Sequence, residues 1–248
     1  MSADEPIFSV IMATQNPGVS LEEALASVFA QQKTSVQVIV VDRGSTDGTA
    51  GWLERQGSRV QPILGAQTLR HFEALNQGLA LAKGKWIFFM DADDRLVGDK
   101  LLSEVAHWGD QTEAAIISGE AAFDDGRINK MASRINPLAG NFISLSASFY
   151  RRGLLEENSG FDPKFIWNAD YEFHIRMWKA HIRFKSLPLR ITACRPGGAR
   201  DLRTWARNRE EIAVRHLYYP AWKCLFWDVA TLLRRTKKAV AKPKSRRH

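Results

Sequence analysis

The chain has 248 residues, 45% hydrophobic and 25% charged, an ordinary globular composition that excludes bulk disorder. No apolar stretch approaches the roughly 20 residues of a bilayer-spanning helix, and Cys194 and Cys224 have neither metal-ligand spacing nor the density of a disulfide framework. The net charge of +8 lies in residues 234–248, which hold eight of the 35 cations and no acid. The rest of the chain is formally neutral, with 27 cations and 27 acids. This distribution argues against a nucleic-acid-binding face on the folded domain.

The first half of the chain alternates strand-like and helix-like segments. Strands are expected at 8–12, 36–41, 60–64 and 86–90, and helices at 21–31, 49–55 and 72–83. Ser20 and Glu23 have the spacing of a capping box before the first helix, and Gly84 follows the third. This alternation predicts an α/β fold with a mostly parallel sheet flanked by helices on both faces.

The second half is less regular. Strands are expected at 114–118 and 144–150, with a hairpin turn at 124–127, and helices at 170–180, 202–216 and 221–240. We expect one domain over residues 1–218, followed at 219–248 by an amphipathic helix and a basic C-terminal tail.

Asp91, Asp93 and Asp94 directly follow the apolar strand at 86–90. Three carboxylates at the end of a buried strand are costly unless a cation, hydrogen-bond donors or water compensate their charge. Oxygen ligands of this kind suit Mg²⁺ or Mn²⁺, although an acidic loop taken alone is equally consistent with a solvated turn. Thr14 and Asp42 also follow strands, and ligands of parallel sheets bind at the carboxyl ends of the strands, which favours a binding site there.

Three segments resemble the nucleotide-sugar glycosyltransferases of family 2, which have the GT-A fold. They are SVIMATQN at 9–16, VVDRGSTDGT at 40–49, and the stretch at 74–94 that contains ALNQG, AKGK and DADD. Their order, spacing and positions after strands agree together, and the resemblance covers about residues 6–200. It implies a nucleotide-binding half at about 6–95 and an acceptor half at about 96–200.

The resemblance also implies roles for individual residues. Asp91 and Ala92 would contact the donor, with Asp91 on the ribose, and Asp93 would hold Mn²⁺ or Mg²⁺. Asp42 would accept a hydrogen bond from a uracil or thymine imide, which favours a UDP- or dTDP-sugar. The base pocket would be lined by Thr14, Asn16 and Asn76.

Plainer interpretations of these residues stay open. Residues 45–47 are of types that favour helix N-caps, and Asp42 is a common turn former. Asn76 is also consistent with a solvated helix face. Arg43 departs from the family pattern, and either an ion pair with Asp47 or a phosphate or a plain surface position suits it.

Inverting transfer needs a carboxylate that takes the proton of the acceptor hydroxyl. Asp170 matches the position of the family's base, while Ala169 stands where Glu is usual, and Glu172 could support or substitute for the base. Asp170 is also consistent with a simple helix cap. The segment 195–200 resembles the family's Gly-Gly loop, with arginines at both ends that either reach the diphosphate or stay exposed. Three histidines show no ligand or nucleophile spacing and are read as structural or solvated: His71, His174 and His181.

Apolar residues recur at helical spacing over 222–233, and the cluster of cations follows. This pattern is typical of an interfacial helix on an anionic membrane surface, and equally of a stripe that packs on the domain before a solvated tail. Residues 1–5 are acidic, unlike an export signal, so a cytoplasmic protein, peripheral on the membrane if the tail binds lipid, is expected.

Taken together, these features predict a metal-dependent inverting glycosyltransferase acting on an acceptor hydroxyl in cell-surface polysaccharide or lipid-linked glycan biosynthesis. A sugar nucleotidyltransferase is an alternative, but the loop at 13–18 lacks the Gly-rich, cation-bearing sequence that such enzymes use for a triphosphate. A non-catalytic nucleotide-sugar- or membrane-binding protein of the same fold is a second alternative. Nucleic acid is not an expected partner.

Overall fold

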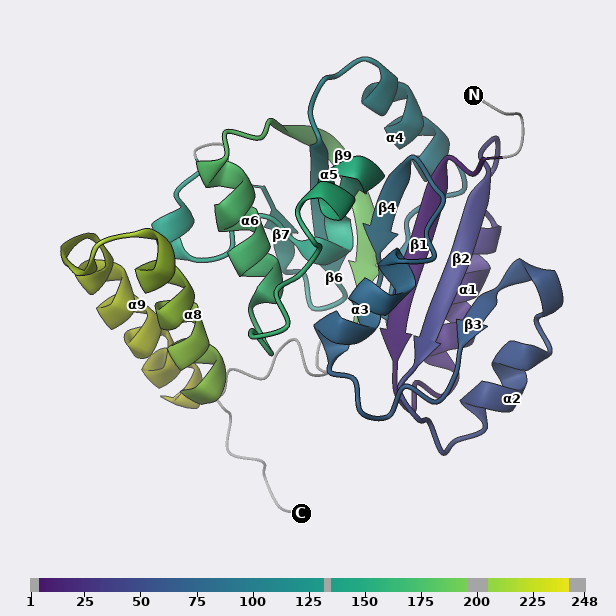
Figure 1. The fold of residues 1–248 in the computed structure, drawn as a ribbon, viewed down its shortest axis with the longest axis horizontal. Coiled ribbons are helices and arrows are strands. Elements are labelled where there is room, and N and C mark those ends of the chain that lie inside the picture. Colours follow the sequence, from purple (N-terminus) through teal and green to yellow (C-terminus); the bar gives the residue numbers. More distant parts are fainter. Residues whose placement is uncertain (1–4, 132–134, 196–204, 241–248) are drawn as a thin grey trace.

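The computed structural model describes residues 5–131, 135–195 and 205–240, in which nine strands form one sheet covered by helices (Figure 1). The strands run in the order β3-β2-β1-β4-β8-β6-β9-β5, and β7 pairs with β6 at the side. Their bounds are β1 Phe8–Thr14, β2 Val36–Asp42, β3 Gln61–Ile63, β4 Trp86–Phe89, β5 Asp94–Leu96, β6 Ile116–Phe123, β7 Ile128–Lys130, β8 Ser148–Arg151 and β9 Phe184–Cys194.

Helices connect these strands and extend the fold at its C-terminal side. Their bounds are α1 Ser20–Phe29, α2 Thr49–Glu54, α3 His71–Leu79, α4 Leu101–Asp110, α5 Arg152–Glu157, α6 Ala169–Lys179, α8 Trp205–Tyr218 and α9 Ala221–Val240. Short 3₁₀ turns lie at η1 Gly57–Arg59, η2 Pro137–Ala139 and η3 Leu145–Ala147. None of the described helices is long and apolar enough to cross a membrane.

The sheet is parallel in its first half and mixed beyond it. β1 pairs in parallel with β2 and β4, and β2 with β3, so the expected parallel arrangement is confirmed for this half. β8 then joins antiparallel to both β4 and β6, and β9 runs parallel to β6. β5 pairs antiparallel with β9, so the strand after the acidic loop crosses to the far edge of the sheet.

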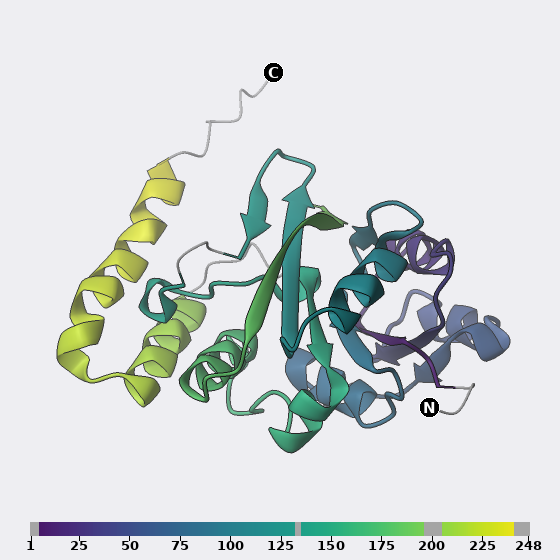
Figure 2. The same ribbon diagram turned by 90° about the horizontal axis from the view of Figure 1, so that it is seen from above.

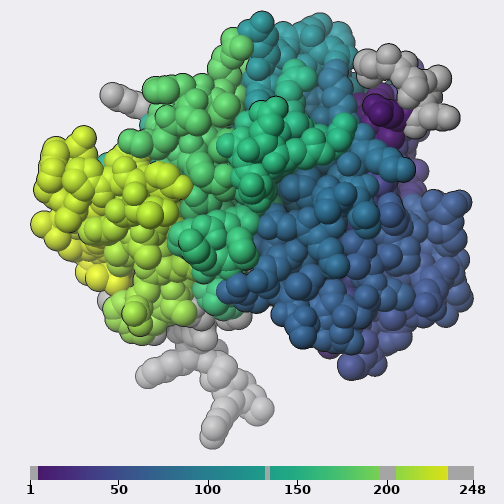
Figure 3. Space-filling view, in the orientation of Figure 1, coloured from purple at the N-terminus to yellow at the C-terminus, as the bar shows by residue number. Residues whose placement is uncertain are grey.

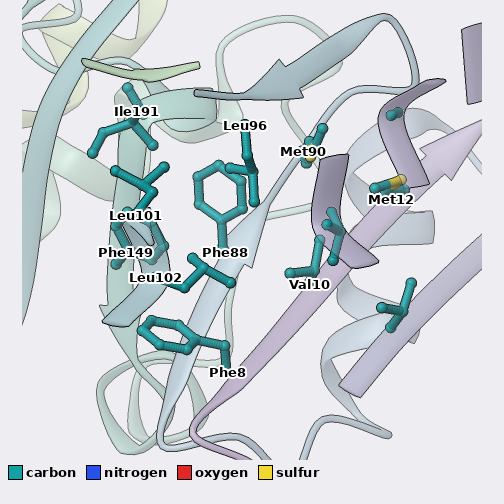
Figure 4. Packing of buried hydrophobic residues seen from close by; sticks show 14 of the residues in the cluster. Phe8, Val10, Met12, Phe88, Met90, Leu96, Leu101, Leu102, Phe149 and Ile191 are labelled. Atoms are coloured by element: carbon teal, nitrogen blue, oxygen red, sulfur yellow. The ribbon is translucent and has the colours of Figure 1, made fainter. Parts of the chain in front are cut away.

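Alternation along the central strands builds two cores, one on each face of the sheet. Phe8, Val10 and Met12 of β1 point to one face, where α1 and α4 pack, and Ile11 and Ala13 point to the other, where α3, α5 and α6 pack. Figure 4 shows the first of these clusters. Because both faces are covered, the central strands are almost entirely apolar apart from the buried Ser9 of β1, and polar groups that could meet a ligand lie at their carboxyl ends.

Two glycines of the segment at 74–94 allow close packing against β1. A Cβ at Gly78 of α3 would lie 2.5 Å from Cγ2 of Ile11, and one at Gly84 would lie 2.3 Å from the backbone nitrogen of Ser9. Real Cβ atoms do not come so close, so α3 and the turn before β4 reach their positions only with glycine. Close packing, rather than ligand binding, therefore accounts for the two glycines in the segment at 74–94.

Several sequence expectations are wrong in detail. The capping box at Ser20 and Glu23 does not form, because Ser20 lies inside α1 with its hydroxyl on the carbonyl of Pro17. The carboxylate of Glu23 binds Arg95 and Arg195 instead. Four elements, α4, α5, β5 and β9, were not predicted from the sequence. The cysteines are buried thiols.

Candidate active site

The ends of β1 and β2 place Thr14 and Asp42 side by side. The two residues are register partners in the parallel pair, and the backbone nitrogen of Arg43 donates to the carbonyl of Thr14 at 2.9 Å. Both side chains are buried. The expected convergence of these strand ends is therefore present.

The loops that follow β1 and β2 are tied to each other by side chains. The backbone nitrogen of Asn16 donates to the hydroxyl of Ser45 at 2.8 Å, and the Asn16 side-chain oxygen accepts from the nitrogen of Thr46 at 2.7 Å. Asp47 accepts from the nitrogen of Gly18 at 2.9 Å. Asn16 has a left-handed backbone, φ 50°, which Asn tolerates better than most residues. The two loops thus form one hydrogen-bonded wall.

Asp42 and Asp47 also serve the local backbone. The Asp42 carboxylate accepts from the nitrogen of Ser45 at 3.2 Å and from its hydroxyl, and Asp42 is only 2% exposed. Asp47 accepts from the hydroxyl and nitrogen of Thr49, the first residue of α2, at 2.6 and 3.2 Å. These bonds, with that of Gly18, lower the pKa of Asp47. The N-cap of α2 is Gly48, and no side chain caps this helix, so Asp47 and Asp42 each stabilise a turn of the loop instead.

The acidic loop lies at the end of the neighbouring strand, β4. Asp91, Ala92 and Asp93 are half-buried, whereas Asp94 is fully buried as the first residue of β5. The nitrogen of Asp94 donates to the carbonyl of Asp91 at 3.1 Å, which closes a turn. Asp94 therefore has a structural place that distinguishes it from the two acids before it.

His71 is a neighbour of this loop that the sequence did not reveal. Its Nε2 lies 3.8 Å from a carboxylate oxygen of Asp91, and both side chains keep about a third of their surface exposed. His71 is the first residue of α3, 20 positions before Asp91 in the chain. From the sequence alone His71 is expected to be structural or solvated, because no spacing links it to the acids.

The acidic loop has the donor chemistry of a hard-cation site. Within the described ranges, no group of three or more His, Cys, Asp or Glu side chains could hold a metal ion by itself. One or two carboxylates, completed by phosphate and water, are nevertheless the usual protein ligands of Mg²⁺. Asp91 and Asp93 therefore fit a cation that is shared with a bound phosphate.

Asn76 has a structural task. Its Nδ2 donates to the carbonyl of Phe161 at 2.7 Å, and its Oδ1 accepts from the nitrogen of Phe161 at 3.0 Å. This pair of bonds joins α3 to the loop before α6. From the sequence, Asn76 is interpreted as part of the base pocket or of a solvated helix face, and neither position explains these contacts.

Asp170 lies in the first turn of α6, which begins on the lower side of the molecule in Figure 1, where β1 and β2 end. Its carboxylate accepts from Nδ2 of Asn141 at 2.7 Å. Burial raises the pKa of Asp170 from its ordinary 3.8 to about 6, and the positive charge of Arg207 opposes this rise. A half-buried carboxylate that ionises near neutral pH can accept a proton in a reaction.

A chain of polar groups leads from Asp170 through the exposed Asn141 to two buried side chains. Because Nδ2 of Asn141 faces the carboxylate, its Oδ1 accepts from Nδ1 of His174 at 2.7 Å, and Nε2 of His174 then accepts from the hydroxyl of Tyr150 at 2.8 Å. Burial lowers the pKa of His174 to about 3, so the ring is neutral and can fill both roles. The sequence reading of His174 as structural agrees with this position, but its link to Asp170 was not visible.

The segment before Asp170 is held by α8. Glu210 accepts from the backbone nitrogens of Ile166 and Trp167, the latter at 2.7 Å, and the side chain of Asn168 donates to the carbonyl of Arg207 at 2.9 Å. These contacts fix where α6 begins.

The two neighbours of Asp170 in the predicted motif are part of the packing. Glu172 is buried and binds Arg176 at 3.0 Å and the hydroxyl of Tyr218, so its carboxylate supports the helix. Ala169 is fully buried in the second core.

The arginines of the nucleotide side bind protein groups in this structure. Nε of Arg43 donates to the carbonyl of Leu69 at 2.9 Å, and Arg195 pairs with Glu23 at 2.5 Å. Arg200 and the rest of the Gly-Gly segment lie outside the described residues. The ion pair of Arg43 with Asp47 that the sequence allowed is replaced by a backbone contact.

Residues 9–180 match the model of the family described as glycosyl transferase family 2. A protein named PGL/p-HBAD biosynthesis glycosyltransferase, from Mycobacterium bovis, is 30% identical over 190 residues, which cover 69% of each chain. A putative teichuronic acid biosynthesis glycosyltransferase, TuaG of Bacillus subtilis, is 32% identical over 100 residues, 39% of this chain and 40% of TuaG.

Solved structures share the fold. TarS of S. aureus, residues 1–349 in complex with UDP-GlcNAc, superposes with a TM-score of 0.71 at 21% identity, covering 85% of this chain and 64% of that one. The mannosyltransferase PcManGT from Pyrobaculum calidifontis, in complex with GDP-Man and Mn²⁺, superposes with a TM-score of 0.63 at 18% identity, covering 98% and 77%. The expected GT-A architecture, with helices added at the C-terminal side, is confirmed.

Proposed function

Because the chain belongs to glycosyl transferase family 2, we propose that it transfers a sugar from a nucleoside diphosphate donor to an acceptor hydroxyl, with inversion at the anomeric carbon. The observation that carries this proposal is Asp170, a half-buried carboxylate with a pKa raised to about 6 that Asn141 holds in place. A base of this kind is what the acceptor side of an inverting transfer requires.

The donor is assigned to the ends of β1, β2 and β4. The wall formed by the loops after β1 and β2 would hold the nucleoside, with Asp42, Thr14 and Asn16 facing the base and Asp91 with Ala92 facing the ribose. TarS, a structural neighbour, binds UDP-GlcNAc, which supports a nucleotide-sugar donor, and we favour a UDP- or dTDP-sugar. Asn76 is left out of this pocket because its amide binds Phe161.

Asp93 would hold Mn²⁺ or Mg²⁺, with Asp91 beside it. When bound, such a cation supplies positive charge that stabilises the departing nucleoside diphosphate. The Mn²⁺ in the structure of PcManGT supports this assignment. The contribution of the protein is to hold the acidic loop in its turn through the Asp94–Asp91 backbone bond and the pairing of β5.

The chemistry on the acceptor side follows from α6. Asp170 would take the hydroxyl proton as the acceptor oxygen attacks the anomeric carbon, and the bond from carbon to diphosphate oxygen would break on the opposite face. Asn141 keeps one oxygen of Asp170 bound, which orients the carboxylate. The acceptor is proposed to be a growing cell-surface polysaccharide or a lipid-linked glycan, which the names of the relatives from Mycobacterium bovis and Bacillus subtilis support.

The test is transfer and donor hydrolysis with a panel of UDP-, dTDP- and GDP-sugars, with Mn²⁺, with Mg²⁺ and with EDTA. We expect one pyrimidine donor to be consumed in the presence of either cation, and EDTA to abolish turnover. Asp170→Asn, in which the base cannot accept the proton, should lose transfer while it still binds the nucleotide. Consumption of a nucleoside triphosphate with release of pyrophosphate would instead identify a nucleotidyltransferase.

A further inference from the structure

The last helix, α9, lies on the outer margin of the molecule. It packs against α8, which separates it from α6 and the sheet, and it touches η2. Figures 2 and 3 show α9 at one end of the protein with its far side turned away from the body. Only one side of this 20-residue helix is therefore available to hold it on the domain.

The side of α9 that faces α8 is polar. Arg215 of α8 is fully buried and donates to Asp228, to Thr231 and to Glu211 of its own helix, each at 2.9 Å. Thr231 and Cys224 of α9 are completely buried on this inner side. Separating a buried arginine from its two carboxylate partners would strongly destabilise the folded protein. This contact therefore fixes which side of α9 faces α8.

The side that faces solvent is apolar, which reverses the usual arrangement of a surface helix. Trp222 is 75% exposed, Phe226 70% and Leu225 66%. With about 100° between successive residues, the exposed apolar residues fall within an arc of about 120°. This outer face consists of Trp222, Leu225, Phe226, Val229, Leu232 and Leu233.

The interpretation that this stripe packs on the catalytic domain is therefore wrong for the described residues. A contiguous exposed apolar patch on a soluble surface marks an interaction site. Eight cations without an acid follow directly in residues 234–248, so the occupant of the outer face has to suit both apolar contact and high positive charge. A second copy of this chain would bring a second cationic tail, whereas anionic lipids neutralise the first.

We propose that the outer face of α9 binds the surface of an anionic lipid bilayer. The helix lies in the plane of the interface with its apolar residues between the headgroups, and the positive charge of the sequence 234–248 favours an anionic surface over a neutral one. Trp222, Phe226 and the leucines are the residue types that the apolar face of an interfacial helix carries. This inference is independent of the donor and of the chemistry at Asp170.

The experiment measures sedimentation of the full chain with phosphatidylcholine vesicles that contain or lack phosphatidylglycerol. Phe226→Glu puts a charge in the outer face, and the fourfold variant R234Q/R235Q/K237Q/K238Q removes cations from the tail. Ile128→Glu is the matched control, because Ile128 is a half-exposed apolar residue of β7 on another part of the surface. Circular dichroism and the thermal midpoint check that each variant folds.

We expect the wild type and Ile128→Glu to bind vesicles with phosphatidylglycerol equally. Phe226→Glu should weaken binding about tenfold or more through lost apolar burial, and the fourfold variant on the order of 1,000-fold through lost attraction to the lipid. High salt should weaken the wild type in the same direction. Undiminished binding by either variant, or no binding by the wild type, would overturn the proposal.

A second measurement distinguishes a protein partner from lipid. In sedimentation equilibrium without vesicles, the wild type should be no more associated than Phe226→Glu. If the wild type is a dimer that Phe226→Glu dissociates, and neither protein binds vesicles, the outer face is an interface between copies of this chain and the membrane proposal is wrong.

Discussion

Asp170 combines two properties that seldom occur in a surface carboxylate: a raised pKa and a fixed orientation. Burial favours its protonated form, so its pKa rises to about 6, while the donor from Asn141 and the charge of Arg207 favour the ionised form. A base must be ionised to take a proton. The proposed reaction should therefore depend on pH near the pKa of Asp170.

For the wild type, kcat/KM should fall about tenfold per pH unit below about pH 6, because the protonated carboxyl cannot act as a base. Asp170→Asn should lower kcat/KM on the order of 100-fold or more and remove this acid limb, since no carboxylate remains to titrate. Initial rates of sugar transfer across the pH range measure both effects. If the acid limb of the pH profile were unchanged in Asp170→Asn, a group other than Asp170 would be responsible for it.

Asn141 is expected to act as a positioning residue for Asp170. In Asn141→Ala the ionised carboxylate loses its 2.7 Å donor, so its pKa should rise and the acid limb should move upward by about one pH unit. Asn129→Ala, on the exposed strand β7, is a matched control that should leave the profile unchanged. A lower kcat with an unmoved limb would mean that Asn141 only supports the fold.

The carboxylates of the candidate site were predictable from the sequence, but their partners were not. Asp91, Asp93 and Asp170 follow apolar segments whose period reveals a strand end or a helix start, and that information is local. Asn141 is 29 residues before Asp170, and His71 is 20 before Asp91. Such pairs come together only through tertiary packing, and the local sequence around a single Asn or His does not identify the residue that it will contact.

At the scale of elements, two helical glycines with different surroundings should respond oppositely in stability to substitution by alanine. Gly78→Ala should destabilise the protein by about 1–3 kcal/mol, because the new methyl group would collide with Ile11 in a filled core. Gly51→Ala, in α2, has its nearest atom 3.6 Å away and should stabilise by about 0.5–1 kcal/mol through helix propensity.

Urea unfolding of the two variants measures the difference directly, with the shared Gly-to-Ala change as the internal control. Equal effects in both variants would show that the backbone preference of alanine decides the outcome and that α3 can move away from Ile11. A loss confined to Gly78→Ala would support the close approach of α3 as the reason for glycine in this motif.

The elements that sequence reasoning missed carry conflicting local signals. β9 contains Pro188, Lys185 and Arg190, which interrupt any alternation, and proline argues against a strand with partners on both sides. The register of β6 against β9 shifts at 118–121, where a Cβ on Gly119 would lie 2.5 Å from the carbonyl of Leu189. A bulge of this kind accommodates the irregular strand, and no local pattern predicts it.

The helix α9 illustrates a different limit of the sequence. Its apolar stripe was visible, but amphipathic period alone does not say which side faces the protein. The buried contact of Arg215 with Asp228 and Thr231 decides the question, because it holds the polar side inward. Neither the arginine nor its partners stood out in the sequence, since charged residues on helices usually lie in solvent.

At the scale of the whole molecule, the proposed donor site and the C-terminal end of α9 lie toward the same side. Figure 1 shows the carboxyl ends of β1 and β2, the first turn of α6 and the last turn of α9 toward the same side. If the acceptor is a lipid-linked glycan, membrane binding would raise its local concentration at Asp170 without a new contact in the site.

The proposed donor and cation sites also predict how the stability of the whole chain responds to ligands. A ligand that binds only the folded state stabilises by about 2.7 kcal/mol at 100 times its Kd, which for a chain of this size raises the thermal midpoint by roughly 5–10 °C. UDP with Mn²⁺ should produce such a rise. UDP with EDTA should produce much less, because the diphosphate then lacks the cation that we propose Asp93 holds.

Asp93→Asn keeps the shape of the side chain but removes its charge, so the thermal midpoint of the unliganded protein should change little and the Mn²⁺-dependent part of the rise should disappear. Asp110→Asn is the matched control, because Asp110 is an exposed carboxylate at the end of α4 that pairs with Lys85. It should respond to UDP and Mn²⁺ like the wild type. If Asp93→Asn responded to UDP and Mn²⁺ like the wild type, the cation would have to be bound by another residue. Asp91, 3.8 Å from His71, would be the first residue to test.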